Sequence, residues 1–187
     1  MNHVDRIEGK TISERQVLFL DYDGTLHRQS ALRTRSGIVS SSPEIELFEF
    51  ADILVECLEA YPLVELVLST SWVRILGYDR ARNALPPMLR QRVVGATYHS
   101  NYHDAWKWPS IGRGIQVLRY VRTHSLARWL AIDDEIDGFD EYLSHVVQCD
   151  ETLGLGDIAI QNLLRLRLAE QFVYAGRPCG ISSGRTP

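Results

Sequence analysis

Short runs of apolar residues alternate along the chain with longer segments in which apolar residues recur at helical spacing. Short apolar runs between turn residues are typical of buried strands, and apolar residues three or four positions apart are typical of helices packed on one face. The runs predict strands at residues 17–20, 63–69, 92–97, 128–133 and 145–150. The amphipathic segments predict helices at residues 43–60, 73–85, 110–122 and 156–170.

Polar residues and prolines mark where these helices begin and end. Ser42-Pro43-Glu44 has the order of an N-cap, a proline in the first turn and an acid in the first turn, so we expect the first helix to begin there. Tyr61-Pro62 and Pro86-Pro87 should end the first two helices. The residues LRLRL (164–168) would suit a strand in isolation, but they lie inside the last helical pattern.

Strands separated by helix-length segments predict βαβ units and a parallel sheet covered by helices on both faces. We therefore expect a three-layer α/β/α, Rossmann-like domain with a five-stranded, mainly parallel sheet over residues 16–173. Residues 1–15 are expected to form a polar N-terminal extension, and residues 174–187 a flexible C-terminal tail. A chain of 187 residues is long enough for one domain with a sizeable core.

Composition changes this picture little, but the distribution of charge adds to it. The net charge of −4 argues against a generally basic nucleic-acid binder. Residues 74–122 hold nine Lys or Arg and two acids, whereas residues 133–157 hold nine acids and no Lys or Arg. The basic segment suits an anionic ligand, and helix surfaces alone could equally produce such blocks.

The cysteines and the N-terminus indicate the compartment. Cys57 and Cys149 lie in apolar patterns and are expected to be core thiols, Cys179 lies in the polar tail, and no Cys-x-x-Cys occurs. No N-terminal run resembles a signal sequence, and no apolar run approaches the length that crosses a membrane. We therefore expect a cytoplasmic protein without a membrane partner, and the sequence indicates no protein partner.

Polar side chains follow three of the predicted strands, at the point where each strand ends. The strand-end residues are Asp21 and Asp23, Ser69 and Thr70 with Ser71, and Asp133 and Asp134. Because the carboxyl ends of parallel strands meet at one edge of a sheet, we expect these side chains to surround a common crevice. Ionised carboxylates in such a setting must be paired or coordinated, and an oxygen-rich site of this kind suits Mg²⁺ with substrate phosphate oxygens.

This set of motifs resembles the haloacid dehalogenase-like (HAD-like) hydrolase superfamily. Its first motif, an apolar strand followed by Asp-x-Asp-Gly-Thr, matches Asp21, Asp23, Gly24 and Thr25 within VLFLDYDGTL. The second motif, an apolar strand that ends in Ser or Thr, matches LVLSTS, with Ser69 as the first candidate and Thr70 as its rival; the acidic fourth motif matches LAIDDE at Asp133 and Asp134. STSW, VVGAT and QCDETLGL further resemble a subgroup of small domains of this superfamily proposed to act in RNA repair.

The third motif is a Lys or Arg near the start of the helix before the fourth strand, and two residues compete for it. Arg113 in SIGRGIQVL is the first candidate and Lys107 in AWKWP the second. Either cation would bind the phosphate group of a substrate together with the strand-end hydroxyl.

The resemblance implies a role for each residue. Asp21 would attack phosphorus and become an aspartyl-phosphate, and Asp23 would protonate the leaving oxygen and later activate water. The resemblance implies Mg²⁺ held by the Asp21 carboxylate, the Asp23 main-chain carbonyl and Asp133 or Asp134. Residues i and i+2 of an extended segment point to the same side, so both carboxylates of the first motif can flank one phosphorus. A second acid in that motif points to an oxygen leaving group, and hence to phosphoester hydrolysis rather than dehalogenation.

The remaining segments bear on the substrate. Only about twenty residues separate Thr25 from the first predicted helix, so no large cap domain is expected, and an open site suits a nucleotide or a phosphorylated polynucleotide end as well as a small metabolite. Arg28, Arg33 and Arg35 lie where the superfamily places a flap, and either contact an anionic substrate or remain solvated. The aromatic loop 98–112 could stack bases, although such a loop more often covers the core. The alternative to an enzyme is a HAD-like module that binds anions without catalysis.

Two other possible metal sites, one for calcium and one for zinc, each lack a ligand. Residues Asp133 to Ser144 begin like a calcium-binding loop but lack the acid at its last position, where Ser144 stands. His99 and His103 lack a third ligand for zinc.

Overall fold

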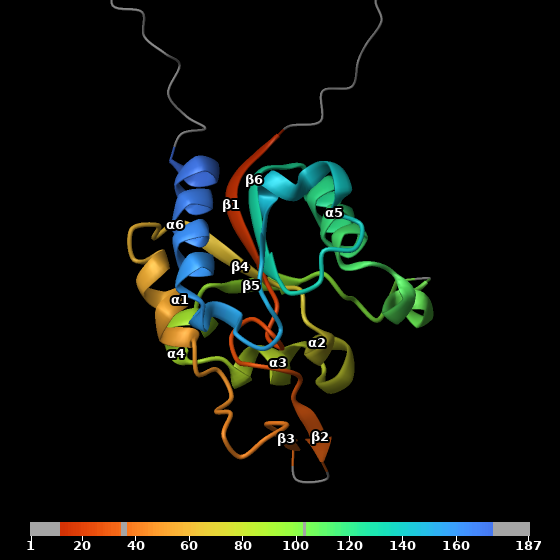
Figure 1. Cartoon of the computed structure of the whole chain (residues 1–187). Helices are drawn as coiled ribbons and strands as arrows, with labels where there is room; N and C mark the ends of the chain where they lie inside the picture. The colour runs from red at the N-terminus through yellow and green to blue at the C-terminus, as the bar shows by residue number, and fades with distance from the viewer. Residues whose placement is uncertain (1–11, 35–36, 103, 174–187) are drawn as a thin grey trace, which may run out of the picture.

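A central parallel sheet organises the protein in the computed structural model, which describes residues 12–34, 37–102 and 104–173. The strands are β1 (Ser13–Leu20), β4 (Val64–Leu68), β5 (Val93–Ala96), β6 (Leu126–Asp133) and β7 (Val146–Gln148). Their order is β5-β4-β1-β6-β7, and every neighbouring pair is parallel. Helices cover both faces, so the predicted three-layer, Rossmann-like fold is confirmed (Figure 1).

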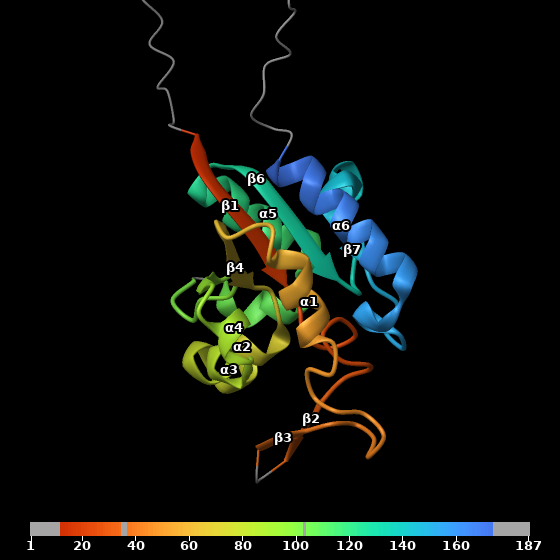
Figure 2. The same cartoon turned by 90° about the vertical axis from the view of Figure 1, so that its left-hand side faces the viewer.

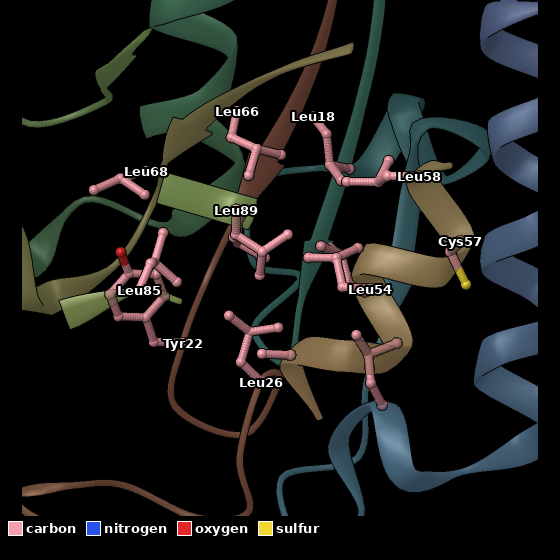
Figure 3. Packing of buried hydrophobic residues seen from close by; sticks show 14 of the residues in the cluster. Leu18, Tyr22, Leu26, Leu54, Cys57, Leu58, Leu66, Leu68, Leu85 and Leu89 are labelled. Atoms are coloured by element: carbon pink, nitrogen blue, oxygen red, sulfur yellow. The ribbon is translucent and has the colours of Figure 1, made fainter. Parts of the chain in front are cut away.

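The alternation of side chains along β1 builds two hydrophobic layers. Leu18 and Leu20 point into the larger cluster, against α1 (Ala51–Leu58), α4 (Pro87–Arg90) and α6 (Ile158–Phe172). Val17 and Phe19 point into the second cluster, against α5 (Arg113–His124). Figure 2 shows α1 and α6 in front of the sheet and α5 behind it, and Figure 3 shows the leucines of the larger cluster. All four of these β1 side chains are fully buried, so β1 anchors both layers.

The first predicted helix is wrong at its N-terminus. Ser42 and Pro43 form an isolated turn, and α1 begins only at Ala51. The cause is Phe48, whose φ of 64° lies in the left-handed region and cannot continue a helix. The cap-like residues therefore serve a turn, and residues 40–50 run across the end of the sheet rather than along it.

The second predicted helix is two helices. α2 (Ser71–Leu76) and α3 (Tyr78–Ala84) are separated by Gly77, which has a φ of 89°. The prolines 86 and 87 do end α3, but Pro87 also begins the short α4. Leu164–Leu168 belongs to α6, as the helical pattern predicts.

A small hairpin projects beyond the strand ends. β2 (Leu32–Thr34) and β3 (Gly37–Val39) pair antiparallel and form a separate two-stranded sheet, which the sequence pattern did not predict (Figure 1). β1 also begins at Ser13, within the segment expected to be an N-terminal extension, whereas residues 1–11 and the predicted tail 174–187 lie outside the described residues. Three short 3₁₀ helices complete the fold: η1 (Ala105–Ser110), η2 (Asp140–His145) and η3 (Gly154–Gly156).

Two further sequence predictions concern the cysteines and membrane-spanning helices. Cys57 and Cys149 are buried free thiols, as predicted, and Cys179 lies outside the described residues. No helix in the described part of the chain has both the length and the apolar character needed to cross a membrane.

Candidate active site

Three strands end at the same level and deliver their polar residues to one place. Leu20 is paired with Leu68 on one side and with Ile132 on the other. The ladder continues for one residue, because the Ser69 amide donates to the Leu20 carbonyl at 2.8 Å and the Asp21 amide donates to the Ile132 carbonyl at 3.2 Å. Asp21, Ser69 and Asp133 therefore occupy neighbouring positions at the carboxyl edge of the sheet, as the predicted convergence requires.

Three aspartates gather at this edge. Asp21, Asp133 and Asp134, here called the aspartate cluster, each offer a carboxylate oxygen within 4.8 Å of the other two. Asp21 and Asp133 are 2% and 1% exposed, so their charges are removed from water. One oxygen of Asp133, Oδ1, accepts a hydrogen bond from the Glu135 amide at 3.0 Å. Such a group of carboxylates requires a cation.

The first residue of α5 supplies one cation. Arg113 lies with its Nη2 3.6 Å from Asp21 Oδ1 and its Nε 3.0 Å from Asp133 Oδ2. Its side chain is 10% exposed, and the solvent-exposed Glu135 lies at 3.9 Å. One guanidinium thus bridges the ends of β1 and β6, and it offsets part of the negative charge of the cluster.

Burial and neighbouring charges shift the pKa values of Asp21, Asp133 and Arg113. Burial raises the pKa of Asp21 to about 7, and nearby Asp134 and Asp23 add to the rise while Arg113 opposes it. Burial and the charge of Asp21 raise the pKa of Asp133 well above its usual range. Burial opposes the charged form of Arg113, but Asp21 and Asp133 outweigh it and raise the pKa of Arg113. The cluster therefore retains protons at neutral pH unless a further cation binds.

The second strand end supplies hydroxyl groups. Ser69 is 1% exposed, and its Oγ has no hydrogen-bond partner within the described part of the chain. Thr70 is the N-cap of α2, and its Oγ1 accepts a hydrogen bond from the Trp72 amide at 3.3 Å. Thr70 therefore caps α2, and the Ser69 hydroxyl remains available to an oxygen ligand.

Gly24 makes the turn that brings the end of β1 against Asp134. Its φ is +65°, and a Cβ atom built on it would lie 2.7 Å from Asp134 Oδ2. Its amide donates to the Gln29 carbonyl at 3.1 Å. The position thus requires glycine for two reasons, the left-handed backbone and the close approach of a carboxylate.

We expect Gly24→Ala to lower the free energy of unfolding by about 2–4 kcal/mol, because the methyl group adds a clash with Asp134 to the strain of a left-handed alanine. Urea unfolding measures this. Gly24→Ala in an Asp134→Ala background is the matched control, since it keeps the backbone strain and removes the carboxylate near the added Cβ. We expect the substitution to cost about 1–2 kcal/mol in that background, and equal losses in the two backgrounds would contradict the steric contribution of Asp134.

Comparison with known families identifies this arrangement. The sequence profile of the HAD domain in Swiss Army Knife RNA repair proteins matches residues 17–159. The chain belongs to this family. The predicted membership of the HAD-like superfamily, and of its RNA-repair-associated subgroup, is thereby confirmed. Comparison with curated proteins and with solved structures gives no match.

Within this HAD domain, the two candidates for the third motif lie in different places. Arg113 contacts the aspartate cluster, whereas Lys107 lies exposed in η1 with its Nζ 4.8 Å from the Trp106 ring centre. Of the two, Arg113 alone has the position that phosphate binding at the cluster requires. Thr25 is fully buried, and its carbonyl accepts a hydrogen bond from the Leu155 amide at 3.0 Å, which joins the segment after β1 to η3.

The surroundings of Asp23 contain residues that sequence reasoning missed. The Trp72 indole donates to Asp23 Oδ2 at 3.0 Å, and His27 Nε2 lies 3.2 Å from Asp23 Oδ1. No sequence pattern assigned Trp72 a contact with Asp23, and none singled out His27, which is fully buried. The only signal available was its position four residues after Asp23.

A polar pocket of about 160 Å³ opens beside Arg113 in this HAD domain. Its lining includes Thr70, Arg74, Trp108, Arg113, Gln116 and Glu135. Trp108 is 4% exposed and packs against Tyr98 and Tyr102, so this part of the aromatic loop does cover the core, while Trp106 is exposed. The pocket is the space next to the aspartate cluster into which part of a substrate can extend.

The two described arginines of the expected flap differ in their surroundings. Arg28 forms an ion pair with Glu49 at 2.9 Å, so its charge is already compensated. Arg33 is exposed on β2, and Arg35 lies outside the described residues, as does His103 of the histidine pair.

Proposed function

We propose that this HAD domain is a Mg²⁺-dependent phosphatase that hydrolyses phosphoric monoesters through an aspartyl-phosphate on Asp21. The observation that carries the proposal is the position of Arg113 and the unpartnered Ser69 hydroxyl beside the aspartate cluster. A nucleophile, a phosphate-binding cation and a hydroxyl donor thus surround one crevice. Family membership supports hydrolysis of this type.

The residues fit a magnesium ion. Asp21, Asp133 and Asp134 present three oxygen donors, which is the ligand type that Mg²⁺ prefers. Burial and the neighbouring carboxylates raise the pKa values of Asp21 and Asp133 although Arg113 is close, which supports the binding of a further cation. When bound, Mg²⁺ would reduce the repulsion between an anionic nucleophile and an anionic phosphoryl group. The Asp23 carbonyl would complete the protein ligands.

The chain's own groups account for both chemical steps. An oxygen of Asp21 attacks phosphorus, the bond from phosphorus to the leaving oxygen breaks, and Asp23 gives that oxygen its proton. Asp23 then accepts a proton from water as the water attacks the phosphorus of the aspartyl-phosphate, which releases inorganic phosphate and restores Asp21. Arg113 and Ser69 hydrogen-bond the equatorial oxygens as charge spreads over them.

For the substrate we propose a nucleotide or a phosphorylated nucleic-acid end. In the described part of the chain, the β2–β3 hairpin and the short helices α2 and α3 lie beyond the strand ends and no large cap domain covers those ends, which supports access for a bulky substrate (Figure 1). The polar pocket holds Arg74 on its rim, which suits a further anionic group of the substrate. The family is named for RNA repair proteins, which supports the same class.

The test is phosphate release from nucleotides, 3′- and 5′-phosphorylated oligonucleotides and sugar phosphates, with Mg²⁺ and with excess EDTA. We expect release from the nucleic-acid class with Mg²⁺ and none with EDTA. Binding of phosphorylated oligonucleotides without any release would instead favour a non-catalytic anion-binding module. Release from sugar phosphates alone would overturn the substrate proposal and leave the reaction type in place.

The affinity for Mg²⁺ should depend on pH. Protons compete with the metal wherever the pKa of a ligand is raised, and that of Asp21 is raised to about 7. We expect the dissociation constant to be roughly tenfold larger at pH 6 than at pH 8, with proton release on binding. Calorimetric titration in two buffers of different ionisation enthalpy measures both quantities, and equal affinity at the two pH values would contradict the assigned ligands.

A further inference from the structure

We propose that Trp72 and His27 are positioning residues that hold Asp23 in the orientation needed for proton transfer to the leaving group. This inference rests on the proposed phosphatase function and extends it to two residues outside the four motifs of the superfamily. Each of them contacts a different oxygen of Asp23, Trp72 at Oδ2 and His27 at Oδ1. Neither would contact the substrate phosphorus, so each acts through Asp23.

Three donors surround the Asp23 carboxylate. The Trp72 indole N–H lies 3.0 Å from Oδ2, while the Ala31 amide at 2.8 Å and His27 Nε2 at 3.2 Å meet Oδ1. An indole and a backbone amide can only donate. Because the two oxygens are bound from different sides, rotation of the carboxylate about its Cβ–Cγ bond would break all three contacts.

The burial of His27 decides which of its nitrogens carries the proton. Its side chain is 1% exposed, and Nδ1 has no hydrogen-bond partner in the described part of the chain. A proton on Nδ1 would bury an unpaired N–H donor, which costs more than burying an unpaired lone pair of the ring. The Nε2–H tautomer is therefore favoured, and His27 donates to Asp23 Oδ1.

Rigid packing holds both donors in place. Trp72 and His27 belong to an aromatic cluster with Tyr22 and Phe48, and the ring centres of neighbouring members are 5.2–6.1 Å apart. Phe48 adopts its left-handed φ of 64° at this place, a conformation that costs a residue of this size of the order of 1–3 kcal/mol. The Phe48 backbone is thus strained at the position where its ring completes the packing around Trp72 and His27.

The N-cap of α2 also holds Trp72 in place. Its amide is bound by the N-cap Thr70, which fixes the first turn of α2 directly after the end of β4. Tyr22, between the two acids of the first motif, donates its hydroxyl hydrogen to the Ala81 carbonyl at 3.0 Å. The cap therefore fixes Trp72 at the end of β4, while the Tyr22 hydroxyl binds α3, the next helix along the chain, and not α2.

This arrangement has a kinetic signature, because only some leaving groups need a proton. An alkoxide leaves phosphorus poorly unless Asp23 protonates it, whereas a nitrophenolate leaves without help. Loss of orientation at Asp23 should therefore slow hydrolysis of alkyl phosphates and spare hydrolysis of p-nitrophenyl phosphate. The quantity to compare is kcat/KM, since it reports the steps up to departure of the leaving group and excludes the later attack of water.

The decisive variant is Trp72→Phe, which removes one N–H and keeps a ring in the aromatic cluster. We expect its kcat/KM to fall roughly 10- to 100-fold for an alkyl phosphate and less than about threefold for p-nitrophenyl phosphate. His27→Phe should show the same selective loss. His27→Gln should recover most of the alkyl activity, because the glutamine amide can place a donor near the position of Nε2.

Tyr22→Phe is the matched control, since it removes a hydrogen bond from the same aromatic cluster without touching Asp23. We expect it to change the two substrates by the same factor, and Asp23→Asn to give the largest selective loss. Thermal unfolding of each variant identifies a folding defect, and the two independent sites keep the test valid if one variant fails to fold.

Equal losses on both substrates in Trp72→Phe and His27→Phe would overturn the inference, because packing alone would then explain them. Unchanged alkyl activity in both would overturn it as well. A wild-type protein that hydrolyses neither substrate would instead contradict the proposed phosphatase function, so the two failures are distinguishable.

Discussion

Replacement of Asp21 by asparagine should abolish phosphate release, with a loss of at least ~10⁴-fold in kcat, because the amide cannot form the covalent intermediate. The variant should nevertheless be more stable than the wild type when no divalent ion is present. Burial raises the pKa of Asp21 to about 7. A raised pKa means that ionisation destabilises the folded state, so stability from this group is present at low pH and is lost as the pH rises through about 7.

Asparagine cannot ionise, so the gain in stability should be roughly 1–3 kcal/mol larger at pH 8 than at pH 5, because over most of that range the folded wild type retains a proton on Asp21 that the unfolded chain has lost. Phosphate assays and urea unfolding at both pH values measure the two effects. Asp52→Asn, on the exposed face of α1, is the control and should alter neither. Retention of activity by Asp21→Asn would exclude the covalent mechanism, and a pH-independent change of stability would contradict the burial argument.

Replacement of Arg113 by methionine should produce the second largest effect and should act in the opposite direction on stability. The guanidinium lies 3.0 Å from Asp133 and 3.6 Å from Asp21, so its removal leaves buried carboxylates without their counter-charge. We expect a loss of about 3–5 kcal/mol in the free energy of unfolding at pH 8, together with a fall in kcat of about 10²–10³-fold.

The pH dependence of this loss follows from the same charges. Without Arg113 the pKa values of Asp21 and Asp133 rise further, because the group that lowers them is gone. At pH 5 both acids are protonated and the variant should approach the wild type in stability. Arg113→Lys keeps one positive charge but loses the second contact, so it should recover most of the stability and only part of the activity. A loss of stability that is equal at pH 5 and pH 8 would show that packing, not charge, is what Arg113 supplies.

The sheet and the convergence of its strand ends could be predicted because they follow from local patterns. Apolar runs bounded by turns locate β1, β4 and β6, and parallel strands necessarily end at one edge. The boundaries that failed depend on contacts from far along the chain. Ser42 and Pro43 look like the start of a helix, but Phe48 leaves the helical conformation in order to pack against Tyr22 and Trp72. Tertiary packing of one ring therefore outweighs the local preference of five residues before it.

The site residues also divide into those that local sequence patterns predict and those that depend on the path of the chain in space. Asp21 and Asp133 could be placed because each directly follows a predicted strand. The choice between Arg113 and Lys107 required the path of the loop between β5 and α5, since both residues precede the same helix in sequence. His27 was missed because the turn at Gly24 folds the chain back, and a sequence gives no measure of that direction.

The central place of β1 has a consequence for the newly made chain. β1 is synthesised before the other strands of the sheet, yet its neighbours β4 and β6 end only at Leu68 and Asp133. Until both neighbouring strands have been synthesised, β1 exposes unpaired backbone groups along its edges and apolar side chains on both faces. Unpaired strand edges of this kind promote aggregation. We therefore expect β1 to need protection during translation, and truncated products that stop before Asp133 to be insoluble.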